Sequence, residues 1–213
     1  EIFKQGMADL LENSPNEDAR ALYEKYAEEC ICNDDSYTKG DYFSSMDEGI
    51  YFNAKADMKG DTTHKPYESA FHEFGHNIDY LANGERAGQY LSNVPINEDG
   101  KRLQDLIKMD YEGYKMALGF QSDREFISDL KSWGLSKLER GSVSDILEYC
   151  TGIDYPLGVG HGAEYHKSDG ASERQFFTEV VSSAIANKES YEFMYEIFPD
   201  AVDAVWKMVR SVI

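Results

Sequence analysis

The sequence is poor in cysteine and in basic residues, and it contains no long apolar run. Three cysteines, Cys30, Cys32 and Cys150, are too few and too irregularly spaced for a disulfide framework or a zinc knuckle. We therefore expect free thiols in a reducing compartment. No apolar stretch approaches the roughly 18 residues that a membrane span needs, and no signal peptide is evident. We expect no membrane partner, and the start at Glu1 without a methionine indicates a piece of a longer protein.

The sequence also has few basic residues relative to acidic ones. The chain has 21 Lys and Arg against 40 Asp and Glu, which gives a formal net charge of −19. A surface of this sign repels phosphate, so nucleic acid is excluded as a partner. The same charge suits a cationic partner, and a peptide or protein substrate with basic residues is therefore compatible with it.

The remaining composition is that of a globular protein, because 41% of the residues are apolar and 13% are aromatic. A length of 213 residues suits a single domain, 1–213, with a helical insertion at about 85–160. Apolar periodicity predicts an α+β fold that is predominantly helical, with a small sheet. Beyond the N-terminal third, helices are expected near 97–118, 122–132 and 143–150, after Ser172, and as a final pair broken at Pro199.

The N-terminal third is expected to hold one helix and one short strand. Ser14 is a suitable N-cap, Pro15 suits the first helical position, and Glu17 completes a capping box, with the helix running to about residue 29. A turn-rich stretch follows over residues 33–49. The strongest strand candidate comes next, in the sequence GIYFNAKAD.

One helix has two distinct faces. The segment AFHEFGHNIDY, residues 70–80, lies in a helix expected to open at Pro66 and to end at Asn83-Gly84. Its apolar positions fall on one side, namely Ala70, Phe71, Phe74, Ile78 and Leu81. His72, His76 and Asp79 fall together on the opposite side. The glycine between the histidines, Gly75, leaves room for another backbone to approach.

The pattern His72-Glu73-x-x-His76 has a chemical rationale. Residues four apart on a helix lie one above the other, so both imidazoles can reach one metal ion. Glu73 is too far around the helix to share that ion easily, but it is well placed to take a proton from a metal-activated water. A surface helix with two solvated histidines is the alternative interpretation.

A catalytic zinc site needs a third protein ligand. On the helix after Ser172, the non-packing stripe holds Gln175, Glu179 and Ser182. Ser172 and Gln175 fit a capping box, which would give Gln175 a structural role, so geometry favours Glu179 as the ligand. The alternatives are two histidines in the glycine-rich segment before this helix, His161 and His166.

Two further residues are expected to support the site. Asp79, one turn beyond His76, could orient that imidazole through a hydrogen bond. Tyr165, just before the Ser172 helix, could donate a hydrogen bond to the oxyanion of a tetrahedral intermediate. A packing role for Tyr165 is the alternative, since the chain has fifteen tyrosines.

The sequence HEFGH followed by FFTEVVSSA resembles the gluzincin metallopeptidases, including the lethal-factor catalytic domain and metallopeptidase-like domains of phage minor head proteins. The resemblance covers residues 50–83 and 160–213. It implies a zincin-like fold with zinc on His72 and His76, Glu73 as general base, and Tyr165 at the oxyanion. It also implies that the strand GIYFN is a sheet edge on which an extended peptide docks.

One departure from the family pattern is serious. In the family's ExxxE helix the first Glu binds zinc and the second supports it, and these positions hold Gln175 and Glu179 here. Glu179 could shift to bind the metal, another residue could substitute, or the site could be weakened. We expect a Zn²⁺-dependent endopeptidase, with an inactive zincin-fold interaction module of a phage-related protein as the alternative and a toxin-like effector protease as a third option. A reducing cytoplasm or a phage-associated location fits these readings.

Overall fold

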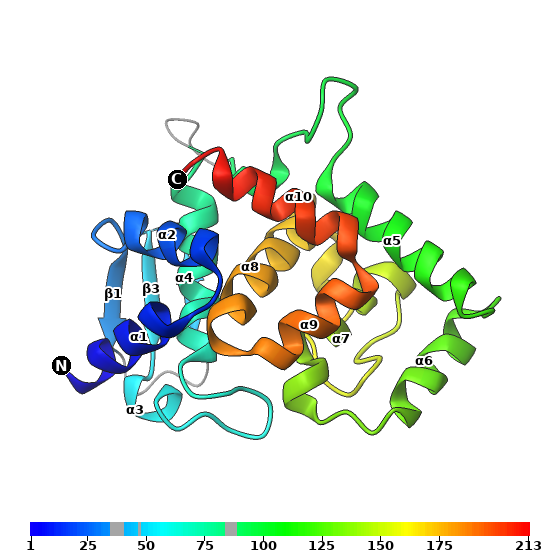
Figure 1. Ribbon diagram of the computed structural model, residues 1–213, viewed down its shortest axis with the longest axis horizontal. Coiled ribbons are helices and arrows are strands. Elements are labelled where there is room, and N and C mark those ends of the chain that lie inside the picture. Colours follow the sequence, from blue (N-terminus) through cyan, green and yellow to red (C-terminus); the bar gives the residue numbers. More distant parts are fainter. Residues whose placement is uncertain (35–40, 47, 84–88) are drawn as a thin grey trace.

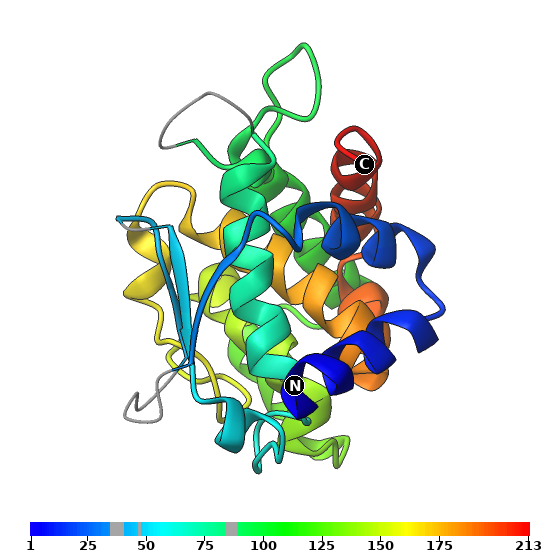
Figure 2. The same cartoon turned by 90° about the vertical axis from the view of Figure 1, so that its left-hand side faces the viewer.

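The computed structural model describes residues 1–34, 41–46, 48–83 and 89–213. Within these ranges the protein is mostly helical and has one small three-stranded sheet (Figure 1), so the predicted α+β class is confirmed. The sheet lies to one side of helix α4 (Glu68–Leu81), and the N-terminal and C-terminal helices lie on its opposite side (Figure 2). No helix in the described ranges is long and apolar enough to cross a membrane.

Two helices precede the sheet, where the sequence predicted one. These are α1 (Ile2–Asn13) and α2 (Glu17–Tyr26). The N-cap of α2 is Asn16, whose side chain accepts a hydrogen bond from the Ala19 N–H, so the assignment of that role to Ser14 is wrong. Ser14 instead ends α1, and its hydroxyl donates to the carbonyl of Ala184. An Asn two residues after a helix end competes equally well for the cap.

The sheet has the strand order β1-β3-β2, formed by β1 (Ile31–Asp34), β2 (Tyr42–Ser44) and β3 (Gly49–Phe52). Strand β3 pairs in parallel with β1 and antiparallel with β2. The predicted strand GIYFN therefore exists, but it is the central strand, and the expectation that it forms a sheet edge is wrong. The edge nearer α4 is β2, inside the stretch predicted as turns. Residues 35–40 and 47 of that stretch lie outside the described residues.

The helices of the main body match the predicted positions with shifted ends. Helix α3 (Ala54–Asp57) leads to α4, and the body consists of α5 (Leu103–Ala117), α6 (Asp123–Ser132), α7 (Lys137–Thr151), α8 (Ala171–Ala186), α9 (Lys188–Ile197) and α10 (Pro199–Arg210). The largest shifts are at two helix starts: α5 starts six residues after its predicted position, and α7 starts six residues before its own. Ser136 and Glu139 form a reciprocal capping box there.

The core is centred on the contact between α4 and α8. Phe71 and Ile78 of α4 are buried with the apolar face of α8, which holds Phe176, Phe177, Val180 and Val181. The predicted apolar faces of both helices are therefore confirmed. Because both helices are fixed by this core, their polar side chains meet at its margin in a defined arrangement.

Candidate metal centre

Helix α4 begins two residues after the predicted start. Tyr67 occupies the N-cap position with a φ of 67°, and the helix runs from Glu68 to Leu81. The Asp57 carboxylate accepts from the backbone N–H of Ala70 at 3.3 Å, which satisfies one of the free donors of the first turn. Gly84 of the predicted helix end lies outside the described residues.

Gly75 allows α4 to pack closely against α8. A Cβ atom added to Gly75 would lie 3.0 Å from Thr178 Cγ2, 3.3 Å from Val181 Cγ2 and 3.4 Å from Thr178 Cα. The predicted close approach of another backbone is therefore confirmed. It brings the polar stripe of α8 within reach of both α4 histidines.

The two imidazoles of α4 face the polar stripe of α8. The ring centroids of His72 and His76 are 4.8 Å apart. His76 Nδ1 lies 3.1 Å from the hydroxyl oxygen of Thr178, and His72 Nδ1 lies 3.6 Å from Glu179 Oε1. Each ring is thus approached at Nδ1 by an α8 side chain, so a metal ion would bind at the Nε2 atoms, of which that of His72 faces Gln175.

Gln175 lies at the centre of this group. Its side-chain nitrogen is 3.5 Å from His72 Nε2 and donates to Glu179 Oε1 at 3.0 Å. Its carbonyl oxygen accepts from the hydroxyl of Tyr165 at 3.4 Å. Glu179 therefore approaches His72 from the Nδ1 side, whereas Gln175 approaches from the Nε2 side.

The predicted capping box at the start of α8 is wrong. Helix α8 begins at Ala171, after Gly170 in the left-handed region with a φ of 73°. Ser172 is buried inside the first turn, with its hydroxyl 3.5 Å from His166 Nδ1. Gln175 is consequently free of a capping role and turns toward the histidines.

The donor set can be tested for a zinc ion. Two imidazole Nε2 atoms and a carboxylate are donors that zinc prefers, and an amide oxygen is a weaker one. Rotation of the Gln175 amide by 180° would exchange its nitrogen for its oxygen beside His72. The ligand atoms of His72, His76 and Glu179 do not form a group in which all lie within 4.8 Å. The residue types therefore fit zinc, with a side-chain rotation of Glu179 or Gln175 needed to complete the set.

Burial changes the protonation of the groups around the histidines. Burial raises the pKa of Glu73 to about 7, against a hydrogen bond from the backbone N–H of Phe43 that favours the charged form. Burial likewise raises the pKa of Glu179 to about 8 and lowers that of His76 to about 4. A carboxylate whose pKa lies near neutrality is suited to accept and return a proton.

Asp79 does not orient His76 in the structure. Both carboxylate oxygens of Asp79 accept from Ser92, one from its backbone N–H and one from its hydroxyl, each at 2.7 Å. The predicted role falls to Thr178 instead. Asp79 was predicted because it lies one turn beyond His76 on the same helix, but the partner of His76 comes from the facing helix α8.

Tyr165 and His161 form one wall of the site. Their rings stack with centroids 4.6 Å apart. Tyr165 as a whole is 38% exposed, while its hydroxyl points inward to Gln175, and burial raises the pKa of this phenol to about 12. The hydrogen bond from His161 Nδ1 to Asp145 at 2.9 Å raises the pKa of that imidazole to about 9. His161 therefore reaches the site but is engaged at one nitrogen, and His166 lies against Asp145 and Glu148 instead.

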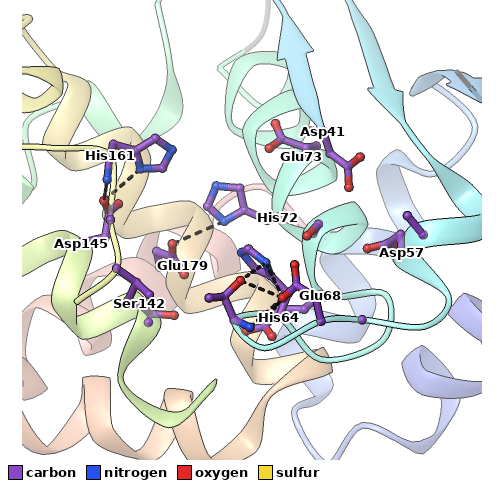
Figure 3. Close-up of a pocket in the computed structure, with 18 of the residues that line it drawn as sticks. Asp41, Asp57, His64, Glu68, His72, Glu73, Ser142, Asp145, His161 and Glu179 are labelled. Atoms are coloured by element: carbon purple, nitrogen blue, oxygen red, sulfur yellow. Dashed lines mark hydrogen bonds and ion pairs between the residues drawn. The ribbon is translucent and has the colours of Figure 1, made fainter. Parts of the chain in front are cut away.

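Two adjoining cavities meet at His72, Glu73 and His161. The larger has a volume of about 690 Å³ and the smaller of about 280 Å³. Figure 3 shows His161 and Asp145 on one side of the larger cavity, Glu73, Asp41 and Asp57 on the other, and His72 between them. The described residues lining this cavity include seven carboxylates and no Lys or Arg; the carboxylates are Asp41, Asp57, Asp61, Glu68, Glu73, Asp145 and Glu179.

Three comparisons with known proteins found no relative of this chain. Protein-family models, curated proteins and solved structures give no match to this chain. The resemblance to the gluzincins therefore depends on the residues of α4 and α8 and on their arrangement.

Several site residues escaped the sequence analysis. Thr178 could have been found, since it lies three residues after Gln175 on the same helical stripe. Asp145 could not, because α7 has no sequence feature that links it to α4. Phe43 contributes its backbone N–H, for which side-chain patterns carry no signal.

Proposed function

We propose that this chain is a zinc-dependent endopeptidase of the gluzincin type with a zincin-like fold. The observation that carries the proposal is the pairing of His72 and His76, with Glu73 beside them, where two cavities meet. In the proposed site His72, His76 and Glu179 hold the metal. A bound zinc ion would lower the pKa of a water molecule and polarise the scissile carbonyl.

The chain's own residues then divide the remaining work. Glu73 takes the proton from the attacking water and delivers it to the leaving amine, which its pKa of about 7 favours. Tyr165 donates from its hydroxyl to the oxyanion of the tetrahedral intermediate, from a position already within 3.4 Å of Gln175. Thr178 fixes the ring of His76 through Nδ1.

The substrate class that suits the site is an extended peptide with basic residues. The larger cavity is lined by seven carboxylates, and the whole chain carries a charge of −19. Both features favour Lys and Arg side chains over acidic ones. The edge strand β2, whose Tyr42 and Phe43 line the smaller cavity, is the position at which a peptide strand could pair.

Gln175 favours a second candidate function. An amide beside His72 Nε2 is a poorer zinc ligand than the carboxylate of the family pattern. A chain with this substitution could retain the zincin-like fold as an interaction module of a phage-related protein, without cleaving peptides. The two functions differ in metal affinity and in turnover.

The first experiment measures bound zinc and cleavage of a library of basic peptides by the purified chain. For the peptidase we expect His72→Ala to remove about one equivalent of bound zinc. We also expect Glu73→Gln to abolish cleavage while zinc remains bound. Weak zinc binding together with no cleavage of any peptide would favour the interaction module.

The third ligand is tested separately with a matched pair of variants. Glu179→Gln should weaken zinc binding if the carboxylate is a ligand, because the amide donates less charge to the ion. Gln175→Glu restores the family pattern. If zinc binds tightly only in the Gln175→Glu variant, the native site is weakened and the peptidase proposal fails.

A further inference from the structure

Beneath His161, helix α7 and the short helix η2 (Tyr165–Lys167) bring together a second group of metal-binding side chains. Asp145 and Glu148 lie three residues apart on α7 and face His166. All three are buried, with 2%, 1% and 7% of their surfaces exposed. Their ligand atoms all lie within 4.8 Å of one another, and no other group of three in the described ranges meets that condition.

Two separations within this group are slightly longer than those of ligands around one ion. His166 Nε2 lies 3.6 Å from Glu148 Oε2 and 3.8 Å from Asp145 Oδ1, which is too long for hydrogen bonds. Ligands of a four-coordinate ion with bonds of about 2.0–2.1 Å are about 3.3–3.4 Å apart. A small contraction would therefore place all three side chains on one ion.

Two atoms of this group lack a hydrogen-bond partner. His166 Nε2 and Asp145 Oδ2 are buried and have no hydrogen-bond partner in the described part of the chain. The second nitrogen of His166 and the second oxygen of Asp145 do have partners. His166 Nδ1 faces the Ser172 hydroxyl at 3.5 Å, and Asp145 Oδ1 accepts from the His161 backbone N–H at 2.9 Å. Metal-binding imidazoles are held in this way by their second nitrogen.

We propose that Asp145, Glu148 and His166 form a second divalent-cation site, separate from the His72–His76 pair, that takes Zn²⁺ or Mn²⁺. Two carboxylates and one imidazole suit these ions. The imidazole disfavours Ca²⁺ and Mg²⁺, which select oxygen ligands, and the site has no thiolate to favour softer ions. A divalent cation would also compensate two carboxylates held together out of water.

The ion would fasten the glycine-rich loop to α7. Glu148 already accepts from the backbone N–H groups of Tyr155 at 2.9 Å and Gly162 at 2.8 Å. His166 brings the end of the same loop to the same carboxylates. The second site is therefore structural, and the loop it holds carries His161 and Tyr165.

The test removes the first site so that the second can be measured alone. The His72→Ala/His76→Ala variant is dialysed against Zn²⁺ and, separately, Mn²⁺, and bound metal is measured by mass spectrometry. We expect about one equivalent of one of these ions and a rise in Tm when it is added. Adding His166→Gln should weaken binding by at least about tenfold and remove the Tm rise. His64→Gln, which removes an exposed imidazole, should leave both unchanged.

The outcomes separate the two sites. If the His72→Ala/His76→Ala variant binds neither ion while the wild type binds one zinc, the second site is overturned and the peptidase proposal is untouched. Metal that survives loss of His72 and His76 but not of His166 supports the second site. Because His166→Gln could unfold the loop, Asp145→Asn is measured in parallel, with circular dichroism to confirm folding. Folded variants that both bind as tightly as their parent would overturn the proposal.

Discussion

Gly75 and Gly113 are both helical glycines, but their surroundings predict opposite effects of an added methyl group. Around Gly113 in α5 nothing lies within 4 Å of an added Cβ, so Gly113→Ala should stabilise the protein by about 0.5–1 kcal/mol through helix propensity. At Gly75 the Cβ would lie 3.0 Å from Thr178 Cγ2, and overpacking costs about 1–3 kcal/mol. We expect Gly75→Ala to lower the free energy of unfolding, measured by urea denaturation.

A second substitution identifies the contact responsible. Thr178→Ser removes Cγ2 but keeps the hydroxyl that faces His76 Nδ1. In the Gly75→Ala/Thr178→Ser double variant, part of the lost stability should return. If the Gly75→Ala variant were as stable as the Gly113→Ala variant, the close packing of α4 on α8 would be contradicted.

Asp57 makes the stability of the fold depend on pH. Burial, and next the nearby Asp41 carboxylate, raise the pKa of Asp57 from 3.8 to about 7. Between these two values the unfolded chain has released this proton and the folded chain still holds it. The unfolded state therefore binds fewer protons, and the free energy of unfolding falls as pH rises from about 4 to about 7.

The measurement compares denaturation curves of the wild type and Asp57→Asn over that pH range. Asparagine stays uncharged, and its side-chain oxygen can still accept from the Ala70 N–H. The decline with pH should be shallower in the variant, and the two proteins should differ most near pH 7. Parallel curves would show that Asp57 ionises in the folded state as readily as in the unfolded chain.

At the scale of elements, the loop between α7 and η2 depends on two glycines in different ways. Gly158 and Gly160 both have positive φ, at 92° and 136°, so alanine is strained at either position. An added Cβ at Gly160 would in addition overlap the carboxylate of Glu148, whereas at Gly158 the nearest atom is 3.9 Å away. Gly158→Ala should cost about 1–2 kcal/mol of stability, and Gly160→Ala should cost more.

Hydrogen exchange provides the readout for this pair. In Gly160→Ala the backbone N–H groups of Tyr155 and Gly162 should lose protection, because the overlap displaces the carboxylate oxygens that accept from them. In Gly158→Ala their protection should stay close to that of the wild type. Equal loss in both variants would mean that backbone strain alone accounts for the effect.

The sequence predicted elements whose signal is local and missed those whose signal is not. The two faces of α4 and of α8 follow from apolar periodicity, and Pro199 marks the break between the last two helices. Strand β2 has three residues, too few for an alternating pattern. Its existence depends on pairing with β3, which no short window of sequence contains.

In the candidate site, too, the residues with a local sequence signal were predictable and the others were not. His72, Glu73 and His76 have a fixed spacing on one helix, so their geometry could be derived before the fold was known. The positions of Gln175 and Asp145 depend on which helices pack together, and α7 is brought to the site by tertiary contacts alone. Gln175 was misassigned because a local capping signal competed with a long-range role.

At the scale of the whole molecule, the excess of acid is partly concentrated at the candidate site. Seven carboxyl groups line the larger cavity beside the histidines, three of them with a pKa raised to about 7 or 8, and 40 acidic residues face 21 basic ones over the chain. A cavity with walls of low dielectric focuses such a field, so its effect on a charged ligand exceeds that of the same charges spread over the surface. The charge of a substrate should therefore affect its capture more than its chemical step.

This argument predicts a salt dependence that discriminates between substrates. For a peptide rich in Lys and Arg, kcat/KM should fall about tenfold or more between low salt and about 0.5 M NaCl, because the Debye length shrinks from about 10 Å at 0.1 M to a few ångströms. For a neutral peptide cleaved at the same bond, kcat/KM should change little. Asp61→Asn, at the exposed rim of the cavity, should reduce the salt effect without altering kcat, since the polar partners of the Asp61 side chain within the described residues are Thr63 and His64 rather than the metal-binding residues. An equal response of both peptides to salt would mean that charge acts on the stability of the protein, through repulsion among its own carboxylates, rather than on substrate capture.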